Sequence, residues 1–171
     1  MHSCCLLFTY IFITGYAIAN ETADPIQARM ERMELIDRFV YDGPLFLKDK
    51  SLPALRKLGR LQNEKKEKHP NRYIPGQAVE YITLTYDGLE IYGDVRERNR
   101  LAPILVVVTG STWNIKHNLS VGAPMSRVIK ALGEPINTNN HALRYCGETE
   151  CVSFMVKDGK ISKIEFDYYD G

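Results

Sequence analysis

The chain lacks an excess of either charge, and it lacks the residue patterns that mark common metal and redox centres. Its 22 Lys and Arg residues balance 21 Asp and Glu residues, which leaves a net charge of +1. A dedicated nucleic-acid-binding protein carries a basic excess, so the composition argues against that class while leaving room for a local basic patch. The four histidines form no His-Glu-x-x-His motif, and no Cys-x-x-Cys pair opens a helix.

Signals for a catalytic nucleophile are equally scarce. Ser120-Val121-Gly122 resembles the second half of a nucleophile elbow, but Asn118 stands where that motif needs Gly. Carboxylates are frequent near predicted turns and strand ends, and no pair of them stands out as an acid and a base. The sequence therefore predicts no catalytic residues, no metal and no cofactor.

No apolar run is long enough to span a bilayer comfortably. The longest covers residues 6–19 (LLFTYIFITGYAIA) and ends in Ala17-Ile18-Ala19, the small-x-small pattern cut by signal peptidase. No Lys or Arg precedes this run, which departs from the usual signal. We expect residues 1–19 to be a signal peptide and residues 20–171 to form one periplasmic or secreted domain without a membrane span. An uncleaved anchor or a buried N-terminal helix is the alternative.

Only two of the four cysteines follow that segment. Cys146 and Cys151 are separated by Gly147-Glu148-Thr149-Glu150, a natural hairpin loop. In an oxidising compartment, this spacing favours a disulfide that fixes the turn. A metal site or a redox pair is the alternative, although no further ligands lie nearby in the sequence.

Three helices are predicted from apolar spacing and end signals. Residues 24–40 begin with a capping Asp and a first-turn Pro and place apolar residues, among them Met30 and Met33, on one face that we expect to pack in the core. Residues 51–58 form a short second helix, and 122–133 a third that ends at a Gly. The polar run 60–72 follows the second predicted helix and precedes the first predicted strand. We interpret it as a helix end and loop, with a surface that binds anions as the alternative.

From residue 78 the apolar period changes to two. Strands 79–86 and 89–95 flank Asp87-Gly88, a strong hairpin signal, and 104–109 (ILVVVT) predicts a strand buried on both faces. Further strands are expected at 142–146, 151–156 and 161–169. The alternation predicts a helix-covered core face formed by Ile82, Leu84, Tyr86, Leu89, Ile91, Val152, Phe154, Val156, Ile164, Phe166 and Tyr168.

The order of these elements hints at an internal repeat. Residues 45–115 and 119–171 can each be described as a helix followed by three strands, with Leu-Gly near the helix end and a hairpin after it. Similarity by chance is the alternative. The predicted fold class is α+β, an antiparallel sheet with helices packed on one face, with two tandem α-β-β-β repeats as its finer form.

The segment from Gly122 to Pro135 (GAPMSRVIKALGEP), followed by strands ending in KDGKISKIEFDYY, resembles the BamE/SmpA-like envelope proteins. These share a fold with the β-lactamase-inhibitor-protein (BLIP) group. The resemblance implies helices on one face of an antiparallel sheet, in two tandem copies among the inhibitors, and it implies no catalytic residues. This chain lacks the lipobox cysteine of the lipoprotein members, which weakens the case for membrane-anchored assembly.

The strand face opposite the core is polar with scattered aromatics, a composition that protein-recognition surfaces favour. We expect Tyr81, Tyr92, Trp113, Met155 and Tyr169 to contribute to a binding face for a protein partner. Exposed Tyr and Thr are also simply good strand formers, which is the alternative.

The sequence as a whole predicts an exported, non-catalytic inhibitor or immunity protein that blocks an enzyme or toxin. An envelope-assembly accessory protein and a small exported hydrolase are the alternatives.

Overall fold

The computed structural model describes residues 24–71, 74–135, 137–139 and 141–168. The predicted signal peptide at residues 1–19 and the predicted site residue Tyr169 lie outside these ranges. Within them, no helix has the length and apolar character needed to cross a membrane.

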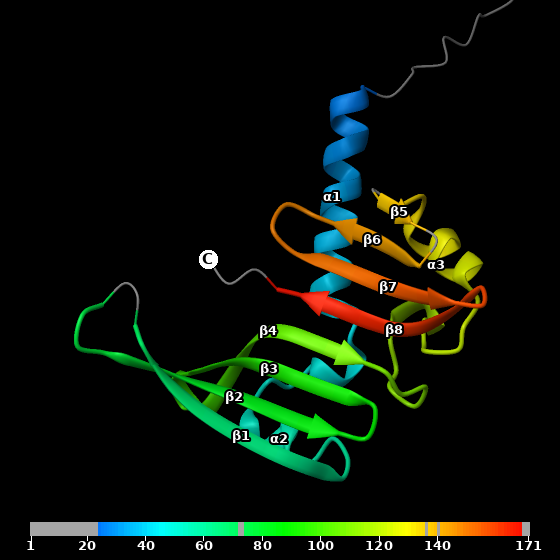
Figure 1. Ribbon diagram of the computed structural model, residues 1–171. Helices are drawn as coiled ribbons and strands as arrows, with labels where there is room; N and C mark the ends of the chain where they lie inside the picture. The colour runs from blue at the N-terminus through cyan, green and yellow to red at the C-terminus, as the bar shows by residue number, and fades with distance from the viewer. Residues whose placement is uncertain (1–23, 72–73, 136, 140, 169–171) are drawn as a thin grey trace, which may run out of the picture.

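The described residues form one antiparallel sheet of eight strands in the order β1-β2-β3-β4-β8-β7-β6-β5 (Figure 1). Two hairpin-linked sets, β1–β4 and β5–β8, meet where β4 pairs with β8, from Leu105 opposite Asp167 to Val108 opposite Ile164. The strands are β1 (Leu61–Pro70), β2 (Ala78–Tyr86), β3 (Leu89–Arg96), β4 (Arg100–Val108), β5 (Asn137–Asn139), β6 (Ala142–Cys146), β7 (Cys151–Lys157) and β8 (Lys160–Asp167).

The helices lie behind the sheet in Figure 1, on one of its faces. They are α1 (Pro25–Asp42), α2 (Leu52–Leu55) and α3 (Met125–Leu132), with single 3₁₀ turns at η1 (Leu45–Leu47), η2 (Glu97–Asn99) and η3 (Lys116–Asn118). The predicted α+β class with helices on one face of an antiparallel sheet is confirmed at this level. Each half contains four strands rather than the predicted three, because the polar segment 61–70 and the short segment 137–139 also pair.

Helix α1 begins as predicted, with the Asp24 side chain accepting a hydrogen bond from the Ile26 N–H at 2.9 Å. Only its C-terminal half packs on the sheet, where Ile36, Phe39 and Val40 are buried. The expectation that Met30 packs in the core is wrong, since its side chain is 58% exposed. The helix is longer than the sheet region it crosses, so its first turns project beyond the strands (Figure 1).

The predicted core face is confirmed. Ten of its eleven side chains are buried and Val156 is half-buried, so strand alternation alone sorted the two faces. The predicted hairpin at Asp87-Gly88 is also present: Gly88 has φ +68, and a Cβ there would lie 2.4 Å from the Cα of Gly110.

Two strand predictions are wrong. Residues 61–70 form the edge strand β1 instead of a helix end and loop, paired with β2 along its length. Strand β4 is not buried on both faces, since Leu105 and Val107 are only half-buried. The two differences have separate causes. No described helix covers the second face, so β4 has one covered side, and β1 was missed because its sequence is polar and has no apolar alternation.

Candidate functional site

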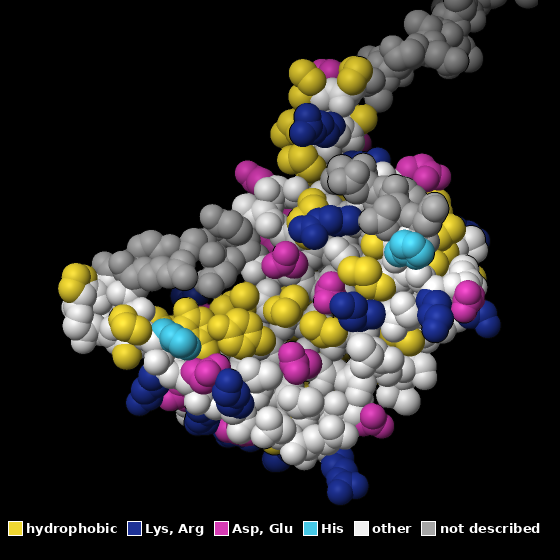
Figure 2. Space-filling model, in the orientation of Figure 1, with side chains coloured by type: hydrophobic (Ala, Val, Ile, Leu, Met, Phe, Trp, Pro, Cys, Tyr) yellow, Lys and Arg dark blue, Asp and Glu magenta, His cyan; other side chains and the backbone are white. Residues whose placement is uncertain are grey.

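No helix of the described residues covers the face of the sheet opposite α1, α2 and α3, which we call the open face; it holds most of the predicted site. Figure 2 looks onto this face and shows hydrophobic side chains gathered in a band across the sheet. Its half-buried side chains include Tyr81, Thr83, Thr85, Tyr92, Leu105, Val107 and Met155. A band of this kind without a covering layer is a feature of interaction surfaces.

Three aromatic side chains from adjacent strands form a row on this face, which we call the aromatic row: His69, Tyr81 and Tyr92. The rings of Tyr81 and Tyr92 are stacked, with centroids 5.8 Å apart and 16° between planes. His69 meets Tyr81 edge-on at 5.4 Å. Cross-strand aromatic contacts of this kind restrict side-chain rotation before any partner arrives.

Charged pairs surround the row. Asp94 stands opposite Tyr81 in the register, is only 8% exposed, and forms an ion pair with Arg96. On the edge strand, Lys65 pairs with Glu67 at 2.9 Å. An apolar centre with a polar rim is the usual arrangement of a protein interface.

The predicted site residues do not all come together. Met155 lies on the open face, but β4 and β8 separate its strand from the Tyr92 strand. Trp113 packs on the helix-covered side, with its ring 5.4 Å from Phe46 and 5.7 Å from Tyr86. Its indole N–H donates to the Asp87 carbonyl at 2.8 Å, so this residue supports the β2–β3 hairpin away from the aromatic row.

The predicted disulfide is present. Cys146 and Cys151 are bonded at the end of the β6–β7 hairpin, where they face each other in the register. Helix α1 holds the loop between them: the Glu148 N–H donates to the Asp37 carboxylate at 3.1 Å, and the Tyr41 hydroxyl donates to the Glu150 carboxylate.

The ionisable groups at this contact influence one another. Burial opposes ionisation of Glu150, but hydrogen bonds from Tyr41 and Thr149 outweigh it and lower its pKa. Burial raises the pKa of Asp37, and the neighbouring Glu150 carboxylate adds to this effect. The hydrogen bond to Glu150 also raises the pKa of Tyr41 to about 12, so the phenol stays a donor at neutral pH.

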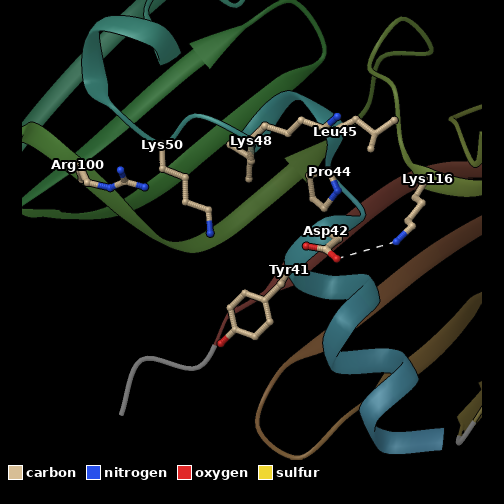
Figure 3. A pocket seen from close by; sticks show the side chains of 9 residues that line it. Tyr41, Asp42, Pro44, Leu45, Lys48, Lys50, Arg100 and Lys116 are labelled. Carbon is tan, nitrogen blue, oxygen red and sulfur yellow. Dashed lines mark ion pairs between the residues drawn. The ribbon is translucent and has the colours of Figure 1, made fainter.

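A second feature was not predicted: a cleft at the C-terminal end of α1, lined by cationic and tyrosine side chains (Figure 3). Two adjoining cavities of about 590 and 650 Å³ share Tyr41, Lys50 and Arg100. These residues are far apart in the sequence, and only the fold brings them together. Among the described residues, no group of three His, Cys, Asp or Glu side chains is placed to hold a metal ion.

Comparisons with protein-family models, curated proteins and solved structures find no match to this chain.

Proposed function

We propose that this protein is exported and acts without catalysis, by docking the open face of its sheet on an enzyme or toxin and blocking it. The observation that carries the proposal is the aromatic row, which spans β1, β2 and β3 on the open face of the sheet. Tyrosine anchors held rigid within a charged rim contribute strongly to binding, because little side-chain entropy is lost on docking.

The arrangement of the sheet supports the finer form of the predicted fold. The sets β1–β4 and β5–β8 each follow a helix, α2 or α3, and they meet at β4 and β8. This order is what two tandem repeats joined side by side would produce, as expected from the BLIP-like resemblance. One continuous face across both sets gives a partner a longer docking surface than either set alone.

Export fits the chemistry of the chain. The apolar run at residues 6–19 has the pattern of a signal peptide. The Cys146–Cys151 disulfide is the state expected for two thiols in an oxidising compartment.

Site-specific photocrosslinking tests the docking face. A photoreactive amino acid at Glu90, exposed on the open face beside the aromatic row, should give a defined adduct in envelope extract. The same group at Arg127 on α3 should not. The adduct should disappear in a Tyr81→Ala/Tyr92→Ala variant and persist in Met30→Ala, a matched loss of an exposed hydrophobic side chain far along α1.

An activity assay then tests inhibition, using the purified protein that was identified in the crosslinked adduct. The wild-type protein should reduce the partner's activity, and the double tyrosine variant should not. Equal crosslinking from Glu90 and Arg127, or undiminished binding by the double variant, would contradict the proposal. An adduct with a membrane-assembly component would favour the envelope-accessory alternative.

A further inference from the structure

The cationic cleft adjoins the charged rim of the aromatic row, with which it shares Arg96, and it is built from several segments of the chain. Tyr41 and Asp42 come from the end of α1, Lys48 and Lys50 from the segment after η1, and Arg100 from the start of β4. Figure 3 shows the Arg100 guanidinium pointing toward the Lys50 side chain, and the Lys50 ammonium group pointing toward the Tyr41 ring.

Cations outnumber carboxylates around the cleft. Its two cavities are lined by five cationic side chains, Lys48, Lys50, Arg96, Arg100 and Lys116, and by the two acidic side chains Asp42 and Glu97.

Two of these cations already have carboxylate partners. Asp42 pairs with Lys116 at 3.9 Å, and Arg96 pairs with Asp94. Within the described ranges, Lys48, Lys50 and Arg100 have no ion-pair partner. Hydrogen bonds from Ser51 lower the pKa of the nearby Asp49, and Arg100 adds a smaller effect in the same direction. An Asp49 oxygen accepts the Ser51 N–H at 2.9 Å, and Asp49 does not line the cleft.

Lys50 is half-buried, whereas Lys48 and Arg100 are exposed. Burial lowers the pKa of the Lys50 ammonium group and the neighbouring positive charge of Arg100 lowers it further, while the Asp42 carboxylate opposes this shift without cancelling it. A positive charge beside a half-buried ammonium group disfavours the charged form of that group. An anion between the Lys50 ammonium and the Arg100 guanidinium would favour the charged form of both groups.

The backbone fixes the two cations in this arrangement. The Leu101 N–H donates to the Lys50 carbonyl at 2.8 Å, and the backbones of Ser51 and Arg100 form an isolated antiparallel β-bridge. The Lys50 ammonium lies 5.7 Å from the centre of the Tyr41 ring and 5.9 Å from that of Tyr168. Both phenols are engaged, Tyr168 with the Val40 carbonyl at 3.0 Å and Tyr41 with Glu150, so the rings are held and present their faces to the cation.

We propose that this cleft binds a small organic oxyanion, with its phosphate or carboxylate group between Lys50 and Arg100 and its apolar part against the Tyr41 ring. A guanidinium group matches two oxygens of such an anion in one plane, and the ammonium group supplies a third donor direction. The cavity volume suits a small molecule. The ligand class does not depend on the protein-binding function proposed above.

Isothermal titration calorimetry with two probes tests the site, using inorganic phosphate and phenyl phosphate at constant ionic strength in chloride. We expect saturable one-to-one binding, tighter for phenyl phosphate because its ring adds contact with the tyrosines. Lys50→Met and Arg100→Gln should each weaken binding about ten-fold or more, which corresponds to loss of one charge-assisted hydrogen bond.

Lys57→Met removes an exposed lysine that does not line the cleft, and it should bind both probes as the wild type does. Tyr81→Ala/Tyr92→Ala should also retain binding, which separates a failure of this site from a failure of the docking face. Thermal unfolding of each variant confirms that it is folded. The proposal is overturned if neither probe shows saturable binding, or if Lys50→Met and Arg100→Gln bind as tightly as Lys57→Met.

Discussion

The Tyr41 hydroxyl on α1 donates a hydrogen bond to the Glu150 carboxylate in the disulfide hairpin, joining two segments far apart in the sequence. The same helix supplies Asp37, whose carboxylate accepts the Glu148 N–H. Helix α1 is therefore attached to the second half of the sheet by polar contacts at the hairpin loop as well as by its buried apolar side chains.

Tyr41→Phe should destabilise the protein by about 1–2 kcal/mol at pH 7, because Glu150, only 7% exposed, loses a donor. The pKa of Glu150 is lowered by folding, so the stability it contributes is present above its unfolded pKa of about 4.3 and is lost as pH falls through its folded pKa. The cost of the substitution should therefore shrink in acid. Urea unfolding of both proteins at pH 7 and pH 3 measures this, and an equal cost at both pH values would contradict it.

Gly147→Ala should destabilise the same contact by about 1–3 kcal/mol. A Cβ at this position would lie 1.7 Å from the Asp37 Oδ1 atom, so the carboxylate must move and its bond to Glu148 is lost. In an Asp37→Ala background the added methyl group has room, and the substitution should cost much less. A double-mutant cycle by chemical unfolding checks this, and additive effects would show that the clash lies elsewhere.

Replacing both cysteines with serine should lower the free energy of unfolding by about 2 kcal/mol, since the ring closed by Cys146 and Cys151 is short. The hairpin lies in the half of the sheet that does not hold the aromatic row, so partner binding by the folded variant should change much less than in the double tyrosine variant. Unfolding of the wild type with and without a reductant provides a second measurement. A variant that loses partner binding while folded would place the hairpin in the docking face.

Trp113→Ala should lower the free energy of unfolding by about 2–4 kcal/mol, because it removes ring contacts with Phe46 and Tyr86 and the hydrogen bond to the Asp87 carbonyl. Tyr92→Ala on the open face should lower the free energy of unfolding by less, since its side chain is only half-buried. In the crosslinking assay we expect the opposite ranking of the two variants. The folded Trp113 variant should still bind the partner, and the Tyr92 variant should not. Loss of partner binding by a folded Trp113 variant would show that Trp113 belongs to the docking surface after all.

The sequence predicted the parts of the fold in which one side of an element is apolar. Periodicity located α1 and sorted the strand faces, and Asp87-Gly88 located a hairpin. It missed β1, because the Lys-rich and Glu-rich edge strand has no apolar alternation to detect. Charged edge strands are common because they discourage unwanted pairing with other chains.

The candidate site was predictable only in part, for a related reason. Alternation places Tyr81 and Tyr92 on the same face, but it does not show that they stack, since that depends on the register between β2 and β3. Lys50 and Arg100 meet through the backbone contact of Lys50 with Leu101, which no local pattern encodes. Trp113 was misplaced because it follows a strand and does not share its alternation.

The pairing of β4 with β8 has a consequence for how the chain is made. Ribosomes build a protein from its N-terminus, so β4 (Arg100–Val108) is complete before residues 109–159 and its partner β8 exist. At ordinary rates of synthesis this interval is on the order of seconds. During that time β4, rich in β-branched residues, has an unpaired edge that can join a second nascent chain, so crowded polysomes and slow codons after Val108 should increase aggregation of this protein.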